Sequence, residues 1–238
     1  MTVNDGRSAP KPASRTNHAA AEPRMRADAR RNRVLVLAAA REVVAERGVT
    51  VPLEEIAERA GVGIGTLYRR FPTRKELIAP IVEELIEEYR LLIEQVVADP
   101  DPWRGFCSYF QQAVAMQVAN RGLAEALTYS PTPILAEQAM RVRQLTRRGL
   151  ASVMRRAKAE GSLRSDFLLT DLQAIFWACG QVADASADAD PDFWRRHLNI
   201  VLDGLRAENR TRMPRAALTR EQLDALQAAN RESGPTLE

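Results

Sequence analysis

The stretch AGVGIGTLYRRFPTRKEL, residues 60–77, places glycines at alternate positions and follows them with a hydroxyl and four basic side chains. The glycines are Gly61, Gly63 and Gly65, and no acidic residue follows them until Glu76. Glycines next to a hydroxyl and to cations suit phosphate, because they let the backbone approach and leave its N–H groups accessible. The stretch is therefore either a nucleotide-cofactor loop or a segment that meets phosphate in another form.

The sequence around these glycines argues against a nucleotide cofactor. A dinucleotide-binding loop follows a buried strand directly, whereas LEEIAERA, residues 53–60, has the apolar spacing of an amphipathic helix. Thr66 occupies the position of the third glycine of such a loop, and the G-K-[ST] of a P-loop is absent. We expect no cofactor.

A helix–turn–helix explains the same residues better. Gly61 can adopt the left-handed backbone that a sharp turn between two helices requires. The spacing of Ile56, Val62, Leu67 and Phe71 gives the pair a buried side. The second helix then presents its polar face outward, as a recognition helix must do in the major groove of DNA.

The remaining sequence predicts an all-α protein of nine or ten helices. Helical apolar spacing begins near Asp28, after a polar tail at 1–27 that we expect to be disordered. It recurs beyond the Asp-Pro-Asp-Pro break at 99–102, and ALTREQLDALQ near the end is a further possible helix. No strand pattern and no membrane-spanning run is found. The later helices are expected over 103–120, 122–129, about 133–159, 170–187 and 191–208.

Charge is concentrated at the N-terminal end. The net charge is +3, yet residues 1–33 carry eight basic and three acidic side chains, and residues 61–75 carry four basic and no acidic ones. This asymmetry favours a polyanionic partner, although basic tails also occur simply as solubilising segments. The two cysteines, Cys107 and Cys179, match no metal or redox motif and indicate a reduced, cytoplasmic protein, with a single disulfide as the alternative.

VLAAAREVVAERG, residues 36–48, followed by LEEIAERAGVGIGTLYRRFPTRKEL, residues 53–77, resembles the DNA-binding domain of the TetR (tetracycline-repressor) family of bacterial regulators. The resemblance covers residues 33–80. It implies an N-terminal helix–turn–helix domain over 28–75, a ligand-binding and dimerisation domain over 76–208, and a C-terminal extension over 209–238. Val51 and Pro52 depart from the family, which often has threonines there.

The resemblance also implies DNA-contacting positions. Hydroxyls of Thr66 and Tyr68 would meet phosphates, while Arg69 would bind either a guanine edge or a phosphate. Arg74, with the start of its helix, would grip another phosphate. Ile64 would touch a thymine methyl group or pack on the first helix. The full predicted set is Gly63, Ile64, Gly65, Thr66, Tyr68, Arg69, Arg70 and Arg74.

The second half resembles the family's scaffold for a small-molecule cavity and a homodimer, which would read a palindromic operator in double-stranded DNA. We expect a mostly apolar or aromatic effector, because no interior cluster of acids or histidines is apparent. The predicted pocket residues are Trp103, Phe106, Phe110, Met116, Tyr129, Met140 and Trp177. The predicted dimer residues, or the core behind them, are Phe176, Gly180, Phe193, Leu198, Val201, Leu202 and Leu205.

An enzyme is not expected, because the chain has two histidines, one of them in the tail, and no pairing of a nucleophile with a base. The alternative within the same fold is an activator, or an architectural DNA-binding protein without a ligand. The sequence does not distinguish these from a ligand-released repressor.

Overall fold

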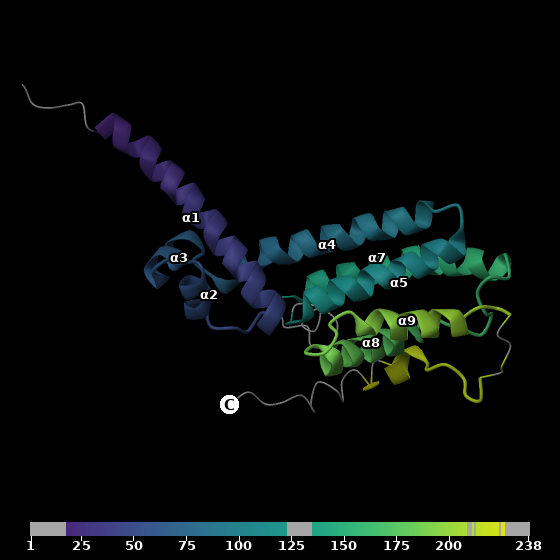
Figure 1. Ribbon diagram of the computed structural model, residues 1–238. Coiled ribbons are helices and arrows are strands. Elements are labelled where there is room, and N and C mark those ends of the chain that lie inside the picture. The colour runs from purple at the N-terminus through teal and green to yellow at the C-terminus, as the bar shows by residue number, and fades with distance from the viewer. Residues whose placement is uncertain (1–17, 123–134, 209–210, 212, 224, 227–238) are drawn as a thin grey trace, which may run out of the picture.

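The computed structural model describes residues 18–122 and 135–208, together with 211, 213–223, 225 and 226 (Figure 1). Within these residues the secondary structure is helical, apart from one isolated β-bridge between Leu163 and Arg206. The all-α fold class is therefore confirmed. The labelled helices are α1 (His18–Arg47), α2 (Leu53–Arg59), α3 (Ile64–Arg70), α4 (Arg74–Ala98), α5 (Pro102–Ala119), α7 (Ala136–Ala159), α8 (Leu172–Ser186) and α9 (Phe193–Gly204).

The first helix is longer than the sequence pattern predicts. α1 begins at His18, so residues 18–27, which we expected to be a disordered tail, are helical. This part of the chain is rich in alanine, the strongest helix former, and can extend a helix without contributing to an apolar face. The rest of the predicted tail, residues 1–17, and most of the predicted helix 122–129 lie outside the described residues.

α1, α2 and α3 form a small three-helix unit at one end of the molecule (Figure 1). The C-terminal half of α1 contributes Val36, Ala40 and Val43, which pack on Ile56 of α2 and Leu67 of α3. These side chains are at most 3% exposed, so the unit has its own apolar interior. α1 projects away from the rest of the molecule beyond this unit.

α4 connects this unit to the remainder of the chain. Thr73 caps its first turn by accepting a hydrogen bond from the backbone N–H of Glu76 at 3.2 Å, and its hydroxyl lies 3.1 Å from the Glu76 carboxylate. The first half of α4, from Leu77 to Ile86, belongs to the apolar cluster of the N-terminal unit. The second half, from Leu92 to Val96, belongs to a second cluster.

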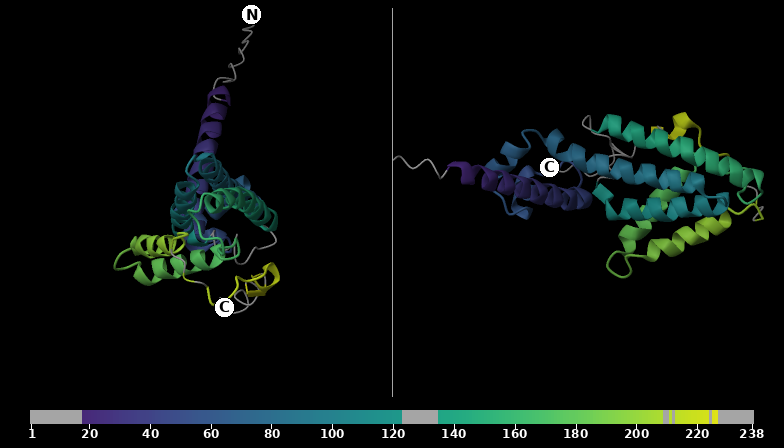
Figure 2. Two further views of the ribbon diagram at one scale, coloured as in Figure 1. Left: turned by 90° about the vertical axis from the view of Figure 1, so that its right-hand side faces the viewer. Right: turned by 90° about the horizontal axis from the view of Figure 1, so that it is seen from above.

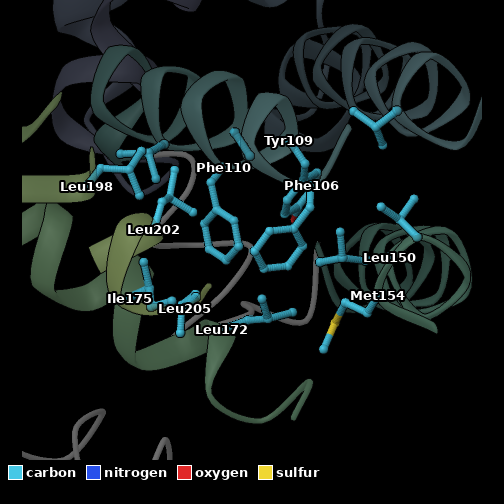
Figure 3. Packing of buried hydrophobic residues seen from close by; sticks show 14 of the residues in the cluster. Phe106, Tyr109, Phe110, Leu150, Met154, Leu172, Ile175, Leu198, Leu202 and Leu205 are labelled. Carbon is cyan, nitrogen blue, oxygen red and sulfur yellow. The ribbon is translucent and has the colours of Figure 1, made fainter. Parts of the chain in front are cut away.

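The second cluster fills the space between α4, α5 and α7 on one side and α8 and α9 on the other (Figures 1 and 2). Phe106 and Phe110 of α5 lie at its centre with their ring centroids 5.1 Å apart, edge to face. Leu150 of α7 and Leu198 of α9 approach them from opposite sides (Figure 3). None of the helices in the described part of the chain is long and apolar enough to cross a membrane.

The chain after α9 contacts the connection between α7 and α8. Arg164, which is 9% exposed, donates from Nη2 to the carbonyl of Thr211 at 2.8 Å and pairs with Asp166. Residues 220–223 are helical, and Thr219 opens this turn by accepting from the N–H of Gln222 at 3.2 Å. In the view of Figure 1 this segment lies below α8.

Candidate DNA-binding surface and ligand cavity

The turn between α2 and α3 depends on Gly61, whose φ is +66°. Its N–H donates to the carbonyl of Glu58 at 3.0 Å, and the N–H of Val62 donates to Ala57 at 3.0 Å. A side chain at this φ would be strained, so glycine is required to reverse the chain within so few residues. The turn brings α3 across α2 with one face outward.

The outward face of α3 carries most of the predicted DNA contacts. Leu67 is fully buried, whereas Tyr68 is 46% exposed and Ile64 is 37% exposed. Arg69 and Arg70 are also exposed, and Nη2 of Arg69 donates to the hydroxyl of the partly buried Thr66 at 3.1 Å. Hydroxyls, cations and one apolar side chain are thus gathered on a single exposed surface.

Gly63 and Gly65 leave open space on this surface. A Cβ added to either glycine would meet no atom within 4 Å in the free chain, and neither has a positive φ. Their backbone does not require glycine for the fold, in contrast to Gly61. The space that they leave is available to a partner.

Arg74 is differently placed from the other predicted contacts. Its side chain is partly buried, and Nη1 donates to the carbonyl oxygens of Val49 and Val51 at 2.9 and 2.6 Å. The start of α4 beside it is already capped by Thr73, with the Glu76 carboxylate nearby. Because of both features, Arg74 and the N-terminus of α4 are less suited to binding a phosphate than the resemblance implies.

Ion pairs hold the N-terminal unit together and against α4. Arg41 of α1 pairs with Glu84 and Glu88 of α4 at 2.7 and 2.8 Å, and Arg47 pairs with Glu55 of α2. These pairs are partly exposed, and such pairs contribute about 0–1 kcal/mol each. Their contribution is mainly to the orientation of α1 relative to α4.

A close backbone contact joins the end of α1 to the residues after α5. A Cβ added to Gly122 would lie 2.1 Å from the backbone nitrogen of Gly48. Gly48 itself has a φ of +82° and ends α1. The N-terminal unit therefore contacts the second half of the molecule at a point where there is no space for a side chain.

A cavity of about 320 Å³ lies between α4, α5, α7, α8 and the C-terminal segment. Leu172 and Phe176 of α8 form part of its apolar wall, and Tyr89 and Tyr109 bring hydroxyl groups. Burial, together with the negative charge of the neighbouring Glu88, raises the pKa of Tyr89 to about 12. Burial likewise raises the pKa of Tyr109, against the lowering effect of a hydrogen bond with Thr146. Both phenols are therefore neutral hydrogen-bond donors at physiological pH.

None of the predicted pocket residues that the structure describes lines this cavity. Phe106 and Phe110 are fully buried in the second cluster, and Met116 is partly buried against both clusters. Trp103 stacks on Phe106, whereas Met140 is 58% exposed on α7. Trp177 lines a separate groove of about 580 Å³ between α5 and α8. Tyr129 lies outside the described residues.

The residues predicted for the dimer interface divide between core and surface. Leu198, Leu202 and Leu205 are at most 6% exposed and pack within their own chain. Phe193 is 47% exposed on α9, and Ile200, which the sequence reasoning missed, is 63% exposed on the same helix. The remaining residues are partly buried: Phe176, which lines the cavity, Gly180, which lines the groove, and Val201.

Both cysteines are free thiols. Cys179 is buried and Cys107 is partly buried, and this burial raises the pKa of each to about 11. Neither thiol is therefore ionised at neutral pH.

Two family models match most of the chain that forms these features. The model described as "Bacterial regulatory proteins, tetR family" matches residues 36–81, which include α2, α3 and the start of α4. The model described as "Transcriptional regulator SbtR-like, C-terminal domain" matches residues 101–207. The extension that carries residues 220–223 lies beyond both matches.

Individual proteins resemble the chain at similar levels. An HTH-type transcriptional regulator of Mycobacterium tuberculosis is 31% identical over 142 residues, which cover 55% of this chain and 68% of the relative. A regulator of Staphylococcus aureus, SAR0097, is 31% identical over 81 residues, which cover 33% of this chain and less than half, 42%, of that relative. The crystal structure of the TetR transcriptional regulator SCO0520 from Streptomyces coelicolor is 32% identical, with a TM-score of 0.50, over 73% of this chain and 98% of that one.

Proposed function

Because this chain belongs to the TetR family and is a transcriptional regulator, we propose that it binds a palindromic operator as a homodimer and releases it when a small molecule binds. The observation that carries the proposal is the outward face of α3, where exposed hydroxyl and guanidinium groups surround two glycines with open space above them.

DNA binding is assigned to residues 28–75, and ligand binding and dimerisation to 76–208. Tyr68 and Thr66 supply hydroxyls for phosphates, Arg69 and Arg70 supply cations, and Ile64 supplies an apolar contact. Gly63 and Gly65 admit the sugar–phosphate backbone. Arg74 is assigned a supporting role, because its hydrogen bonds to Val49 and Val51 hold the loop before α2.

A dimer is proposed to form through α8 and α9. One α3 helix is too short to give operator affinity by itself, whereas two copies related by a two-fold axis can read two half-sites. The exposed Phe193 and Ile200 lie on the outer side of α9, while Leu198 on its inner side is buried. This distribution supports an apolar contact with a second copy.

Ligand response is proposed to run through α4. This helix begins beside the recognition helix, and Tyr89 further along it lines the cavity. A ligand that binds one position of α4 better than another shifts the population toward that position. Displacement of α4 would change the separation of two recognition helices, and operator affinity would fall.

The test is a footprint on the DNA upstream of the gene and of its neighbours, followed by binding of the full-length chain to the protected site. We expect protection of a palindrome, and weaker binding to every DNA sequence by Tyr68→Phe, since that change removes one hydroxyl from an exposed residue. Ser108→Ala, which removes a hydroxyl on α5 away from both the cavity and α3, is the control and leaves operator binding unchanged. Absence of any protected site would contradict the proposal.

A further inference from the structure

The mouth of the 320 Å³ cavity carries positive charge from two distant parts of the chain. Arg143 and Arg147 reach it from α7, and Arg220 reaches it from the C-terminal segment. No aspartate or glutamate is among the described residues that line it. Arg143 and Arg147 are four residues apart on α7, and like charges at this spacing repel each other and destabilise the helix slightly. An anion at this opening relieves that repulsion.

The interior of the cavity is apolar with a few hydrogen-bonding groups. Leu172 and Phe176 supply apolar surface, and Leu223 of the C-terminal segment, 8% exposed, covers it from the outside. The hydroxyl of Thr170, which also lines the cavity, is buried and has no hydrogen-bond partner in the described part of the chain. A buried hydroxyl without a partner is costly unless a bound molecule or water satisfies it.

The C-terminal segment is held in place by specific contacts. Arg164 anchors its beginning through the carbonyl of Thr211, and Thr219 caps the turn that presents Arg220 and Leu223. Residues 220 and 223 lie one helical turn apart, so they reach the same side of the segment. The segment is therefore positioned to form one wall of the cavity.

We propose that this cavity binds an amphipathic organic anion, with its acidic group at Arg143, Arg147 and Arg220 and its apolar body against Leu172, Phe176 and Leu223. The inference rests on the proposed function for the existence of an effector, and it specifies the effector's charge and adds the C-terminal segment to the binding site. A carboxylate suits guanidinium groups, which can hold it through two parallel hydrogen bonds. The cavity volume accommodates a ligand of about the size of two fused rings or a medium-length acyl chain.

The experiment is calorimetric titration of the full-length protein, without DNA, with two acids and their neutral amides. The probes are naphthalene-2-carboxylate with naphthalene-2-carboxamide, and decanoate with decanamide. We expect at least one acid to bind, with its amide binding about tenfold more weakly because the amide lacks the charge. Equal binding of acid and amide, or no binding of either acid, would overturn the proposal.

Variants test the contribution of the C-terminal segment. Arg220→Gln is expected to lower the affinity for the acid by about tenfold and to leave the affinity for the amide unchanged. Arg220→Lys is expected to retain the preference for the acid. Leu223→Ala is expected to lower the affinities for the acid and for the amide equally, because it removes apolar contact with both ligands. Arg215→Gln, an exposed arginine of the same segment that does not line the cavity, is the control. If Arg220→Gln behaves as Arg215→Gln does, the segment has no part in binding.

The calorimetric titrations test ligand binding separately from DNA binding, because no DNA is present in them. Operator binding by the unliganded protein decides the proposed regulatory function, whatever the probes do. An acid that binds the cavity without weakening operator binding would support the site and contradict the ligand response.

Discussion

Nη1 of Arg74 lies 2.6 Å from the carbonyl oxygen of Val51, and the same nitrogen also donates to the carbonyl of Val49. Both valines are at most 5% exposed, so these carbonyls have limited access to water. A cation that resembles a phosphate ligand by sequence position instead fastens the loop between α1 and α2 to the start of α4.

Arg74→Ala is therefore expected to act on stability. Removing the guanidinium leaves two carbonyls without their donor, and we expect the free energy of unfolding in urea to fall by about 1–3 kcal/mol. The salt dependence of operator affinity is expected to stay unchanged. Lys75→Ala, the adjacent exposed cation, is the control for stability. A salt slope lowered by about one with normal stability would instead demonstrate a direct phosphate contact.

Gly65→Ala separates folding from DNA binding. A Cβ at this exposed helical position meets no atom of the free chain, so the unfolding free energy is expected to rise by about 0.5–1 kcal/mol. Operator affinity is expected to fall, because the new methyl group occupies space proposed for DNA. Gln111→Ala, at an exposed position of α5, is the control and is expected to leave operator affinity unchanged. If a gel-shift titration of Gly65→Ala showed unchanged operator affinity, the DNA would not lie against this part of α3.

Gly122→Ala tests the contact between the N-terminal unit and the second half. The added Cβ would overlap the backbone at Gly48, so the two segments must separate. We expect a loss of about 1–3 kcal/mol in the free energy of unfolding, with a change in operator affinity. Gln111→Ala is again the control. Wild-type stability by urea denaturation together with wild-type affinity would mean that this contact is dispensable.

Ile200→Asp tests the proposed dimer. Ile200 is 63% exposed, so a carboxylate there leaves the single chain intact but becomes buried when two copies meet. We expect the wild-type chain to be dimeric at micromolar concentration by light scattering and the variant to be monomeric. Leu91→Asp, at a residue 52% exposed on α4, should remain dimeric. A monomeric wild-type chain would contradict the proposed dimer interface on α8 and α9.

The elements that could be predicted from sequence are those that local signals determine. Gly61 marks the turn, Leu67 and Phe71 mark the inner side of α3, and together they imply that Tyr68 and Arg69 face outward. The structure places all five in this way, because helical periodicity over a few residues fixes which side is buried.

The cavity could not be predicted, because residue size does not distinguish a core position from a cavity wall. Phe106 and Phe110 were expected in the pocket and lie in the core, whereas Tyr109 between them lines the cavity. Arg220 comes from a segment distant in sequence, and no local pattern links it to Arg147. The capping sequence Thr-x-x-Gln at Thr219 was the available signal for an ordered C-terminal segment.

The division of the apolar interior along α4 has a consequence for the engineering of hybrid regulators. Leu77 and Ile86 complete the interior of the DNA-binding unit, while Leu92 begins the other cluster. A graft cut at residue 75 would remove part of that interior and expose the rest. A new sensor fused to this DNA-binding unit should therefore be joined within α4, between Ile86 and Leu92, and it must also supply apolar side chains in place of Leu135 and Ala139, which pack in the same cluster.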